Sequence, residues 1–171
     1  KVSDADGYII YRSDSKDDLG TEIDSYSDPS VTTYHDSEVK LDVGTKYYYH
    51  VVSYVKAMGS MGTRHESDPI SNYKIVLPAQ VLNLKADSAG LTDAHLAWDP
   101  VDGVDGYEIW YKKSSGKYSL LDRVTDTEYD VNDLTGGTKY TFKIRGYAGD
   151  ETDGVFGAYS EAVSVTPAPM P

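Results

Sequence analysis

The strongest constraint on the fold of this chain is a repeat within its own sequence. Residues 2–11 recur as residues 101–110 at an offset of 99 positions, and residues 44–49 recur as residues 137–142 at an offset of 93. The difference between the two offsets falls in the intervening segments, and loops tolerate such changes of length. The chain is therefore expected to contain two copies of one module.

The second copy predicts seven short strands. Inward residues such as Tyr107 and Ile109 alternate with outward residues such as Glu108, Trp110 and Lys112, and a period of two is typical of half-buried strands. The predicted strands cover residues 82–86, 94–98, 107–112, 118–123, 129–131, 140–145 and 163–165. Seven strands in roughly 90 residues, joined by turns and without a helical period, predict an antiparallel sandwich.

Composition excludes several classes of function. The 171 residues contain 16 Lys and Arg against 28 Asp and Glu, a net charge of −12, so binding to a nucleic-acid backbone is not expected. The chain has no cysteine, which excludes disulfides and thiolate chemistry. It also has no apolar run of the roughly 20 residues that a membrane helix requires, so membrane insertion is not expected.

The second copy resembles the fibronectin type III module, in the form found in secreted and surface proteins of Gram-positive bacteria. The resemblance rests on Trp98, on residues 101–112, on residues 134–140 and on residues 159–163. It implies that Tyr140 is the conserved tyrosine corner of the family. The matching residues of the first copy are Gly7, Tyr8, Leu41, Gly44, Thr45, Tyr47 and Ser67. The resemblance implies an all-β fold of antiparallel, immunoglobulin-like sandwiches in tandem.

The repeat and the resemblance together predict the domain boundaries. Residues 78–167 form a complete module, and residues 168–171 begin a further linker. Residues 1–77 form a module that lacks its first two strands, including the core tryptophan. Its inward residues, Tyr8, Ile10, Tyr47, Tyr49 and Val51, are then expected to lack a covering sheet. The missing strands are supplied either by upstream residues or by another chain through strand addition.

The sequence predicts no catalytic, cofactor-binding or metal site, and thus no enzyme. His35, His50, His65 and His95 are scattered, without the spacing of a metal-binding motif. His50 and His95 are expected to face solvent from their strands. No nucleophile elbow or phosphate-binding glycine loop is present.

Two acidic stretches resemble calcium loops only superficially. Residues 14–20 place Lys16 and Leu19 where an EF-hand requires a ligand and a glycine. Residues 150–154 contain three carboxylates before the last strand. We interpret both stretches as solvated acidic loops.

Any binding site is left unassigned by the sequence. The loops before the last strands, residues 56–66 and 149–158, are where sandwiches often recruit partners. They contain Met58, Met61, Arg64, His65, Val155 and Phe156, of which Phe156 is expected to pack locally. Three aromatic residues are expected to point outward: Trp110, Tyr48 and Tyr54. They either stack on sugar rings of a ligand or form cross-strand pairs, and the second interpretation is the simpler one.

Three functions remain open. The first is a non-catalytic spacer and interaction module pair, located outside the cell or at its surface, in a larger bacterial protein. Its partners are neighbouring modules of the same chain and a protein or carbohydrate ligand. The second is an adhesin segment that binds a host or carbohydrate ligand, and the third is an accessory module of a secreted polysaccharide-degrading enzyme. The absence of cysteine and of Asn-x-Ser/Thr sites favours Gram-positive export.

Overall fold

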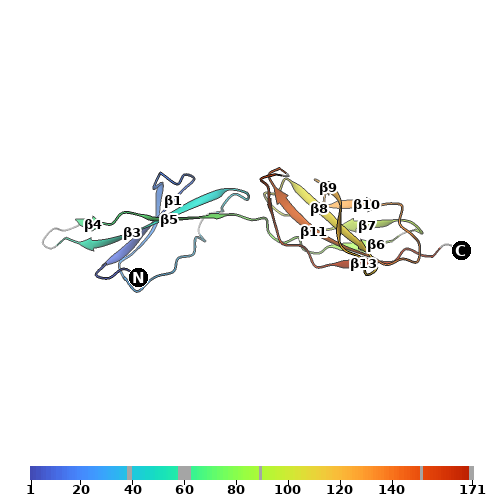
Figure 1. Ribbon diagram of the computed structural model, residues 1–171, viewed down its shortest axis with the longest axis horizontal. Coiled ribbons are helices and arrows are strands. Elements are labelled where there is room, and N and C mark those ends of the chain that lie inside the picture. Colours follow the sequence, from blue (N-terminus) through green and yellow to red (C-terminus); the bar gives the residue numbers. More distant parts are fainter. Residues whose placement is uncertain (38–39, 58–62, 89, 151, 170–171) are drawn as a thin grey trace. The chain divides into compact units, whose positions relative to one another are not determined.

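The protein is all-β and forms two compact units, Lys1–Val76 and Leu77–Pro171 (Figure 1). The computed structural model describes residues 1–37, 40–57, 63–88, 90–150 and 152–169. These residues contain thirteen strands and no helix, and every pair of neighbouring strands is antiparallel. The predicted all-β fold class is confirmed.

The second unit consists of two sheets. One has the order β10-β7-β6, and the other has the order β12-β11-β8-β9 with β13 also paired to β11. The strands are β6 (Lys85–Asp87), β7 (Ala94–Ala97), β8 (Gly106–Lys113), β9 (Ser119–Val124), β10 (Glu128–Val131), β11 (Tyr140–Ala148), β12 (Val155–Phe156) and β13 (Val163–Val165). All seven predicted strands are present in whole or in part, and β12 is the one that the alternation did not predict.

The core of the second unit lies between these two sheets. Tyr107 and Ile109 of β8 and Phe142 of β11 pack against residues of the smaller sheet, including Leu96. Trp98 is buried in the same cluster, and its ring meets the Tyr107 ring edge-on at 5.4 Å between centroids. Fully burying a large apolar side chain contributes about 1.5–3 kcal/mol, so this cluster dominates the stability of the unit.

The start of the second unit differs from the predicted alternation. Strict alternation through the predicted strand 82–86 would place Leu82, Leu84 and Ala86 on one inward face, but Leu82 is 58% exposed whereas Leu84 is buried. The cause lies between them, because Asn83 adopts a left-handed backbone with φ of 54°. A residue in that conformation breaks the two-residue period, and β6 therefore begins only at Lys85.

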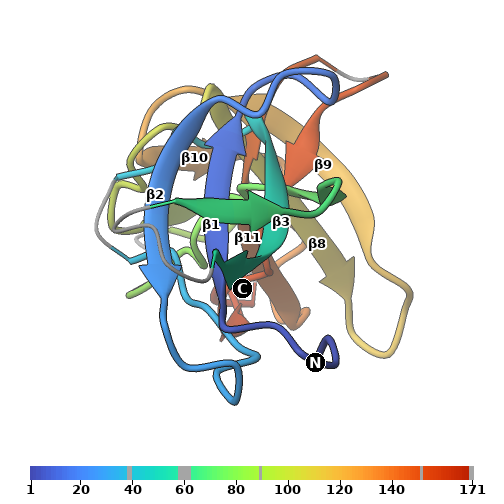
Figure 2. The ribbon, with the colours of Figure 1, turned by 90° about the vertical axis from the view of Figure 1, so that its left-hand side faces the viewer.

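The first unit has one five-stranded sheet. Its order is β2-β1-β3-β4, and β5 pairs with the remaining length of β3. The strands are β1 (Gly7–Ser13), β2 (Thr21–Tyr26), β3 (Lys46–Lys56), β4 (Arg64–Glu66) and β5 (Ile70–Ile75). Figure 2 shows β1 between β2 and β3.

This sheet repeats the larger sheet of the second unit. Ile9 of β1 lies opposite Val52 of β3, just as Glu108 of β8 lies opposite Arg145 of β11. Both units also place a glycine beneath a tyrosine ring where the central strand begins. A Cβ atom on Gly7 would lie 2.6 Å from the Tyr54 hydroxyl, and one on Gly106 would lie 2.7 Å from the Tyr147 hydroxyl. Only glycine fits these close approaches.

The inner face of the first unit is covered in part. Tyr8 and Ile10 are buried, which corrects the prediction that they lack a cover. Val51 is 39% exposed, however, whereas its counterpart Ile144 is fully buried. The partial cover comes from the segment after β2, which lines an apolar hollow of about 290 Å³ together with Tyr8, Ile10, Val51 and Ile70.

A polar contact lies beside this hollow. The Arg12 guanidinium is 2.6 Å from the Asp36 carboxylate, and the Tyr49 hydroxyl donates to the same oxygen at 2.9 Å. Burial, followed by the hydrogen bond to Asp36, raises the pKa of Tyr49 to about 12. The equivalent residues of the second unit, Tyr111 and Phe142, instead stack at 6.5 Å. Arg12 thus lies on the inward face, at the position that Tyr111 holds in the second unit.

Candidate functional site

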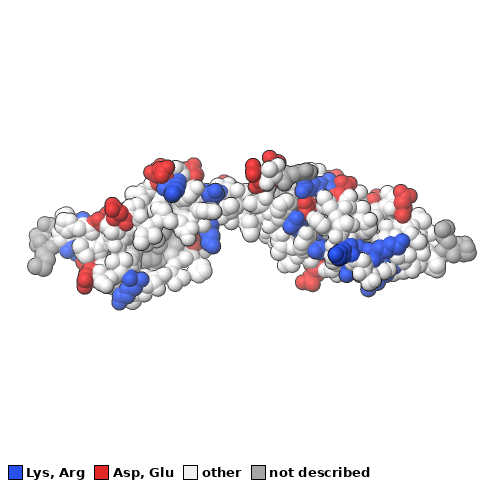
Figure 3. Space-filling view, viewed as in Figure 1, with Lys and Arg blue, Asp and Glu red and all other residues white. Residues whose placement is uncertain are grey.

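The outer face of the larger sheet in the second unit gathers cations and aromatic rings. Glu108, Trp110 and Lys112 of β8 point away from the core, and Lys143 and Arg145 of β11 lie beside them. Figure 3 shows lysine and arginine side chains gathered on the visible face of this unit. Four of the eight Lys and Arg of residues 78–171 belong to this outer face: Lys112, Arg123, Lys143 and Arg145.

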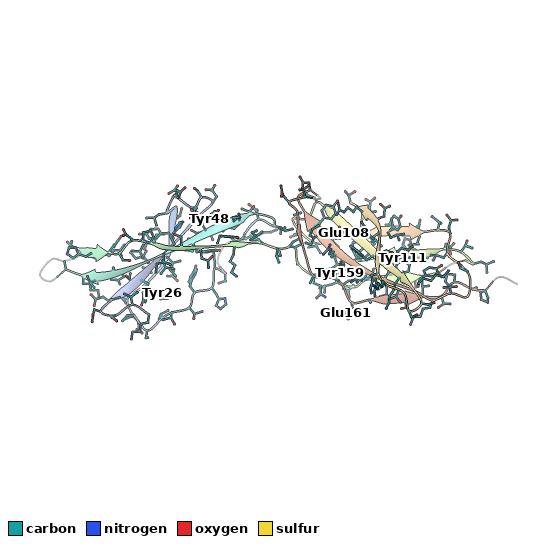
Figure 4. The ribbon with its side chains drawn as sticks, in the orientation of Figure 1. Tyr26, Tyr48, Glu108, Tyr111, Tyr159 and Glu161 are labelled. Carbon is teal, nitrogen blue, oxygen red and sulfur yellow. The ribbon has the colours of Figure 1, made fainter. Side chains whose placement is uncertain are left out.

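Glu108 is the centre of a buried charge network, although it lies on the outward side of its strand (Figure 4). Arg123 donates to one carboxylate oxygen through Nη2 at 2.7 Å and Nε at 3.1 Å. Arg145 Nε at 2.8 Å and Trp110 Nε1 at 2.9 Å donate to the other oxygen. Burial opposes ionisation, but these hydrogen bonds outweigh it and hold the pKa of Glu108 below its usual value.

Lys143 lies between two tyrosine rings. Its ammonium is 3.5 Å from the centroid of the Tyr159 ring and 4.3 Å from that of the Tyr118 ring. Lys112 contacts the same Tyr118 ring at 5.0 Å. Desolvation by burial, followed by repulsion from Arg145 and Lys112, lowers the pKa of Lys143. We call the set Trp110, Lys112, Tyr118, Lys143, Arg145 and Tyr159 the cation–aromatic face.

Phe156 closes the edge of this face. The Arg145 guanidinium lies 4.1 Å from its ring centroid, and the Tyr147 ring lies 6.5 Å away. The prediction that Phe156 packs locally is confirmed. Sequence reasoning did not group Glu108 with Arg123 and Arg145, because that grouping requires the register across β9, β8 and β11.

The structure corrects the prediction for His50. This side chain was expected to face solvent, but it is 2% exposed. Its ring nitrogens lie 3.1 Å from the Ser13 hydroxyl and 2.7 Å from the Ser71 hydroxyl, on the two flanking strands. Because the Ser13 hydroxyl already donates to the Ser15 carbonyl at 2.5 Å, it accepts from His50 and is not poised as a nucleophile.

The other three histidines are exposed. His95 faces solvent as predicted, and its Nδ1 lies 2.7 Å from the Asp130 carboxylate. That hydrogen bond raises the pKa of His95. His35 follows Tyr34 in the segment that lines the inner face, and His65 lies in β4. Among the residues that the structure describes, no three His, Asp or Glu side chains are placed to hold a metal ion.

The two acidic stretches use their carboxylates locally. Asp150 accepts hydrogen bonds from the amides of Thr152 and Asp153 at 2.8 and 2.9 Å, which lowers its pKa. Asp18 accepts from the Gly20 amide at 3.0 Å. Both contacts are those of ordinary turns. Glu151 lies outside the described residues.

Two of the outward aromatic residues, Tyr48 and Trp110, pack against another aromatic ring. Tyr48 packs against Tyr73 at 5.8 Å, and Trp110 meets Tyr159 edge-on at 6.1 Å. Tyr54 is buried beneath Arg64, whose guanidinium lies 5.3 Å from its ring, so Tyr54 is not available to stack on a ligand. Met58 and Met61 of the first candidate loop lie outside the described residues.

The described part of the chain includes no helix that is long and apolar enough to cross a membrane.

Two known proteins with similar sequences are named as receptors. Over 130 residues the chain is 35% identical to chicken (Gallus gallus) receptor-type tyrosine-protein phosphatase eta, a match that covers 72% of this chain and 9% of that protein. Over 95 residues it is 34% identical to human (Homo sapiens) ephrin type-A receptor 8, covering 52% of this chain and 9% of that protein. The chain thus spans less than a tenth of these curated relatives.

A solved structure has a similar fold. The two fibronectin type III domain segment from chicken tenascin matches with a TM-score of 0.59 and 21% identity, covering 96% of this chain and 85% of that one. The family profile described as the fibronectin type III domain matches residues 78–165, which is half of the chain. The two-sheet sandwich and the sequence match agree, and the chain belongs to the fibronectin type III family.

Proposed function

We propose that the chain is a non-catalytic pair of fibronectin type III modules that spaces and presents an interaction surface in the extracellular part of a larger protein. Modules of this family commonly serve as interaction or spacer domains. Two of the similar proteins are named receptors, which supports an extracellular setting. The buried carboxylate Glu108 is bound by Arg123 and Arg145 within its sheet, and Asp150 and Asp18 are bound by amides of their own turns.

One observation carries the tandem arrangement: both units make the same three contacts. The Val2 amide donates to Tyr8 Oη at 2.8 Å, and the Val101 amide donates to Tyr107 Oη at 2.9 Å. The amides of Asp6 and Asp105 donate to the carbonyls of Tyr54 and Tyr147, both at 2.8 Å. The Asp6 carboxylate accepts a hydrogen bond from the Lys56 amide, and the Asp105 carboxylate accepts one from the Gly149 amide, both at 2.7 Å.

The first unit, residues 1–77, is in this proposal a module of the same kind without the two strands that residues 78–99 contribute to the second. The exposed Val51 beside an apolar hollow supports this interpretation. Strands from outside residues 1–77 would supply the counterparts of β6 and β7 in the smaller sheet of the second unit. Residues 168–171 then begin a further linker.

The Gram-positive setting is a finer part of the proposal. The absence of cysteine and of Asn-x-Ser/Thr sites from all 171 residues supports it. The curated relatives named above are vertebrate proteins, so the same module pair also suits a eukaryotic receptor. The sequence of the parent protein decides between the two.

The spacer role can be tested by measuring the distance between the chain ends. Because the chain has no cysteine, Lys1→Cys and Pro171→Cys introduce two unique sites for fluorescent labels. A short linker that contains Pro78 predicts a narrow distribution of distances, as for a semi-rigid spacer. A broad distribution, as for a flexible tether, would contradict the spacer role.

A further inference from the structure

The first unit is an internal control for the cation–aromatic face. It builds the same sheet in the same register, yet it has Ser13, His50 and Val52 where the second unit has Lys112, Lys143 and Arg145. Ile9 likewise replaces Glu108 and packs with Val52 in a small apolar cluster. The sheet therefore forms without these cations, and the fold alone does not account for them.

Two of the cations lack an anionic partner. Among the described residues, neither Lys112 nor Lys143 forms an ion pair, and Arg145 binds Glu108 through Nε. Lys143 is partly buried between rings, and an ammonium that has lost water without gaining a carboxylate attracts an anion. Within the described part of the chain, Glu108 is the carboxylate that these contacts place in the cluster.

The face is also held in place before any ligand arrives. Trp110, Lys112, Tyr118, Lys143, Arg145 and Tyr159 are all partly buried, and each contacts a neighbouring ring or cation. Fixed side chains lose little conformational entropy on binding. Tryptophan, tyrosine and arginine are moreover the residues that contribute most to the centres of protein–protein interfaces.

We propose that the cation–aromatic face docks a protein partner through carboxylate-bearing side chains of that partner. This inference rests on the proposed interaction function and names the surface and the chemistry of the partner. A protein fits better than a long anionic polysaccharide, because residues 78–171 carry 15 Asp and Glu against 8 Lys and Arg. An extended polyanion would reach beyond the cation–aromatic face and be repelled by the acidic residues around it. A few carboxylates on a protein surface would contact the cation–aromatic face without that repulsion.

The test uses the full chain with two probes of equal charge, a ten-residue peptide of alternating Glu and Ala and a sulfated oligosaccharide. Amide NMR spectra are followed during titration at about 150 mM salt, where charges beyond about 8 Å are screened. The peptide is expected to shift the amides of residues 110–112 and 141–145. Replacing both lysines, Lys112→Met with Lys143→Met, is expected to weaken peptide binding at least tenfold.

The matched control is Lys85→Met, which removes an exposed lysine of β6 on the other sheet and is expected to leave affinity within twofold. If the double variant loses spectral dispersion, Lys112→Gln alone serves, with an expected loss of about fivefold. Any of four outcomes would overturn the inference. These are amide shifts that map elsewhere, equal binding by the variants, tighter binding of the oligosaccharide than of the peptide, and no binding of either probe. These outcomes leave the distance measurement, and with it the spacer role, untouched.

Discussion

Tyr47 and Tyr140 hold equivalent positions in the two units, and each hydroxyl accepts a hydrogen bond from a backbone amide five residues earlier in the chain. The donors are Asp42 at 3.2 Å and Thr135 at 3.0 Å. The contact in the second unit is the tyrosine corner that residues 134–140 predicted, with Tyr140 buried in the core. The contact in the first unit shows that the same corner forms there beneath a partly open face.

The corner predicts a stability loss in the second unit. Tyr140→Phe removes the acceptor for the Thr135 amide, and losing one such hydrogen bond costs about 1 kcal/mol. Chemical denaturation should show a lower midpoint for this variant. Tyr111→Phe is the matched control, because its ring stacks on Phe142 and its hydroxyl makes no hydrogen bond with the described residues. Equal midpoints for Tyr140→Phe and wild type would contradict the role of the corner.

Glu108 predicts a larger effect that depends on pH. Glu108→Gln keeps the shape but removes the charge that Arg123 and Arg145 bind, and breaking a buried ion pair is expected to cost about 2–4 kcal/mol near pH 7. The pKa of Glu108 is lowered in the folded state, so its charge stabilises the fold above the unfolded pKa. That contribution is lost as pH falls through the folded pKa.

Denaturation of both proteins between pH 3 and pH 7 checks this prediction. The difference between wild type and Glu108→Gln should shrink as the solution becomes acidic. Glu128→Gln, which changes an exposed carboxylate of β10, is the control and should have little effect. A difference that stays constant with pH would mean that the network owes its stability to shape rather than to charge.

His95 predicts a small effect with the opposite dependence on pH. Its pKa is raised by the hydrogen bond to Asp130, so the contact stabilises the fold below the unfolded pKa of histidine. The contribution is lost as pH rises through the folded pKa. The pair is exposed, so His95→Gln should lower the melting temperature by only about 1–3 °C at pH 5, and not at pH 9. An equal loss at both values would contradict an ionic contact.

The second unit should fold without a metal ion. Residues 78–167 contain the complete two-sheet core, and the Asp150 carboxylate is already used by two amides. A chelator is therefore expected to leave the melting temperature of this fragment unchanged. A fall of more than about 4 °C, the shift for roughly 1 kcal/mol in a domain of this size, would reveal an ion site at residues 150–154.

The open face predicts that residues 1–77 do not behave as an isolated monomer. Val51 and Ile70 are exposed beside the apolar hollow, and such patches recruit a partner or aggregate. Light scattering should show association or unfolding. Joining residues 78–100 of this chain before Val2 supplies the two strands and Trp98, and should give a monomer that melts cooperatively. A stable monomer of residues 1–77 alone would contradict the proposed boundary.

Alternation and repeat spacing predicted the parts of the fold that depend on backbone geometry. The inward set of Tyr140, Phe142 and Ile144 is buried as expected, because consecutive strand residues point to opposite faces. Leu82 could not be placed this way, because the left-handed Asn83 interrupts the period. The prediction for His50 was wrong and the burial of Glu108 was not predicted, because burial on an outer face depends on side chains from neighbouring strands, whose register the sequence does not show.

The substitution of Glu108 for Ile9 between equivalent strands has a consequence for how neighbouring modules avoid misassembly. Adjacent copies of one fold risk exchanging strands during folding. If β1 replaced β8 in the second unit, Ile9 would stand where Arg145 now binds the Glu108 carboxylate. If β8 entered the first unit, Glu108 would be buried opposite Val52 without either arginine. Each exchange leaves a buried charge unmatched, so this single difference makes each strand fit its own unit best.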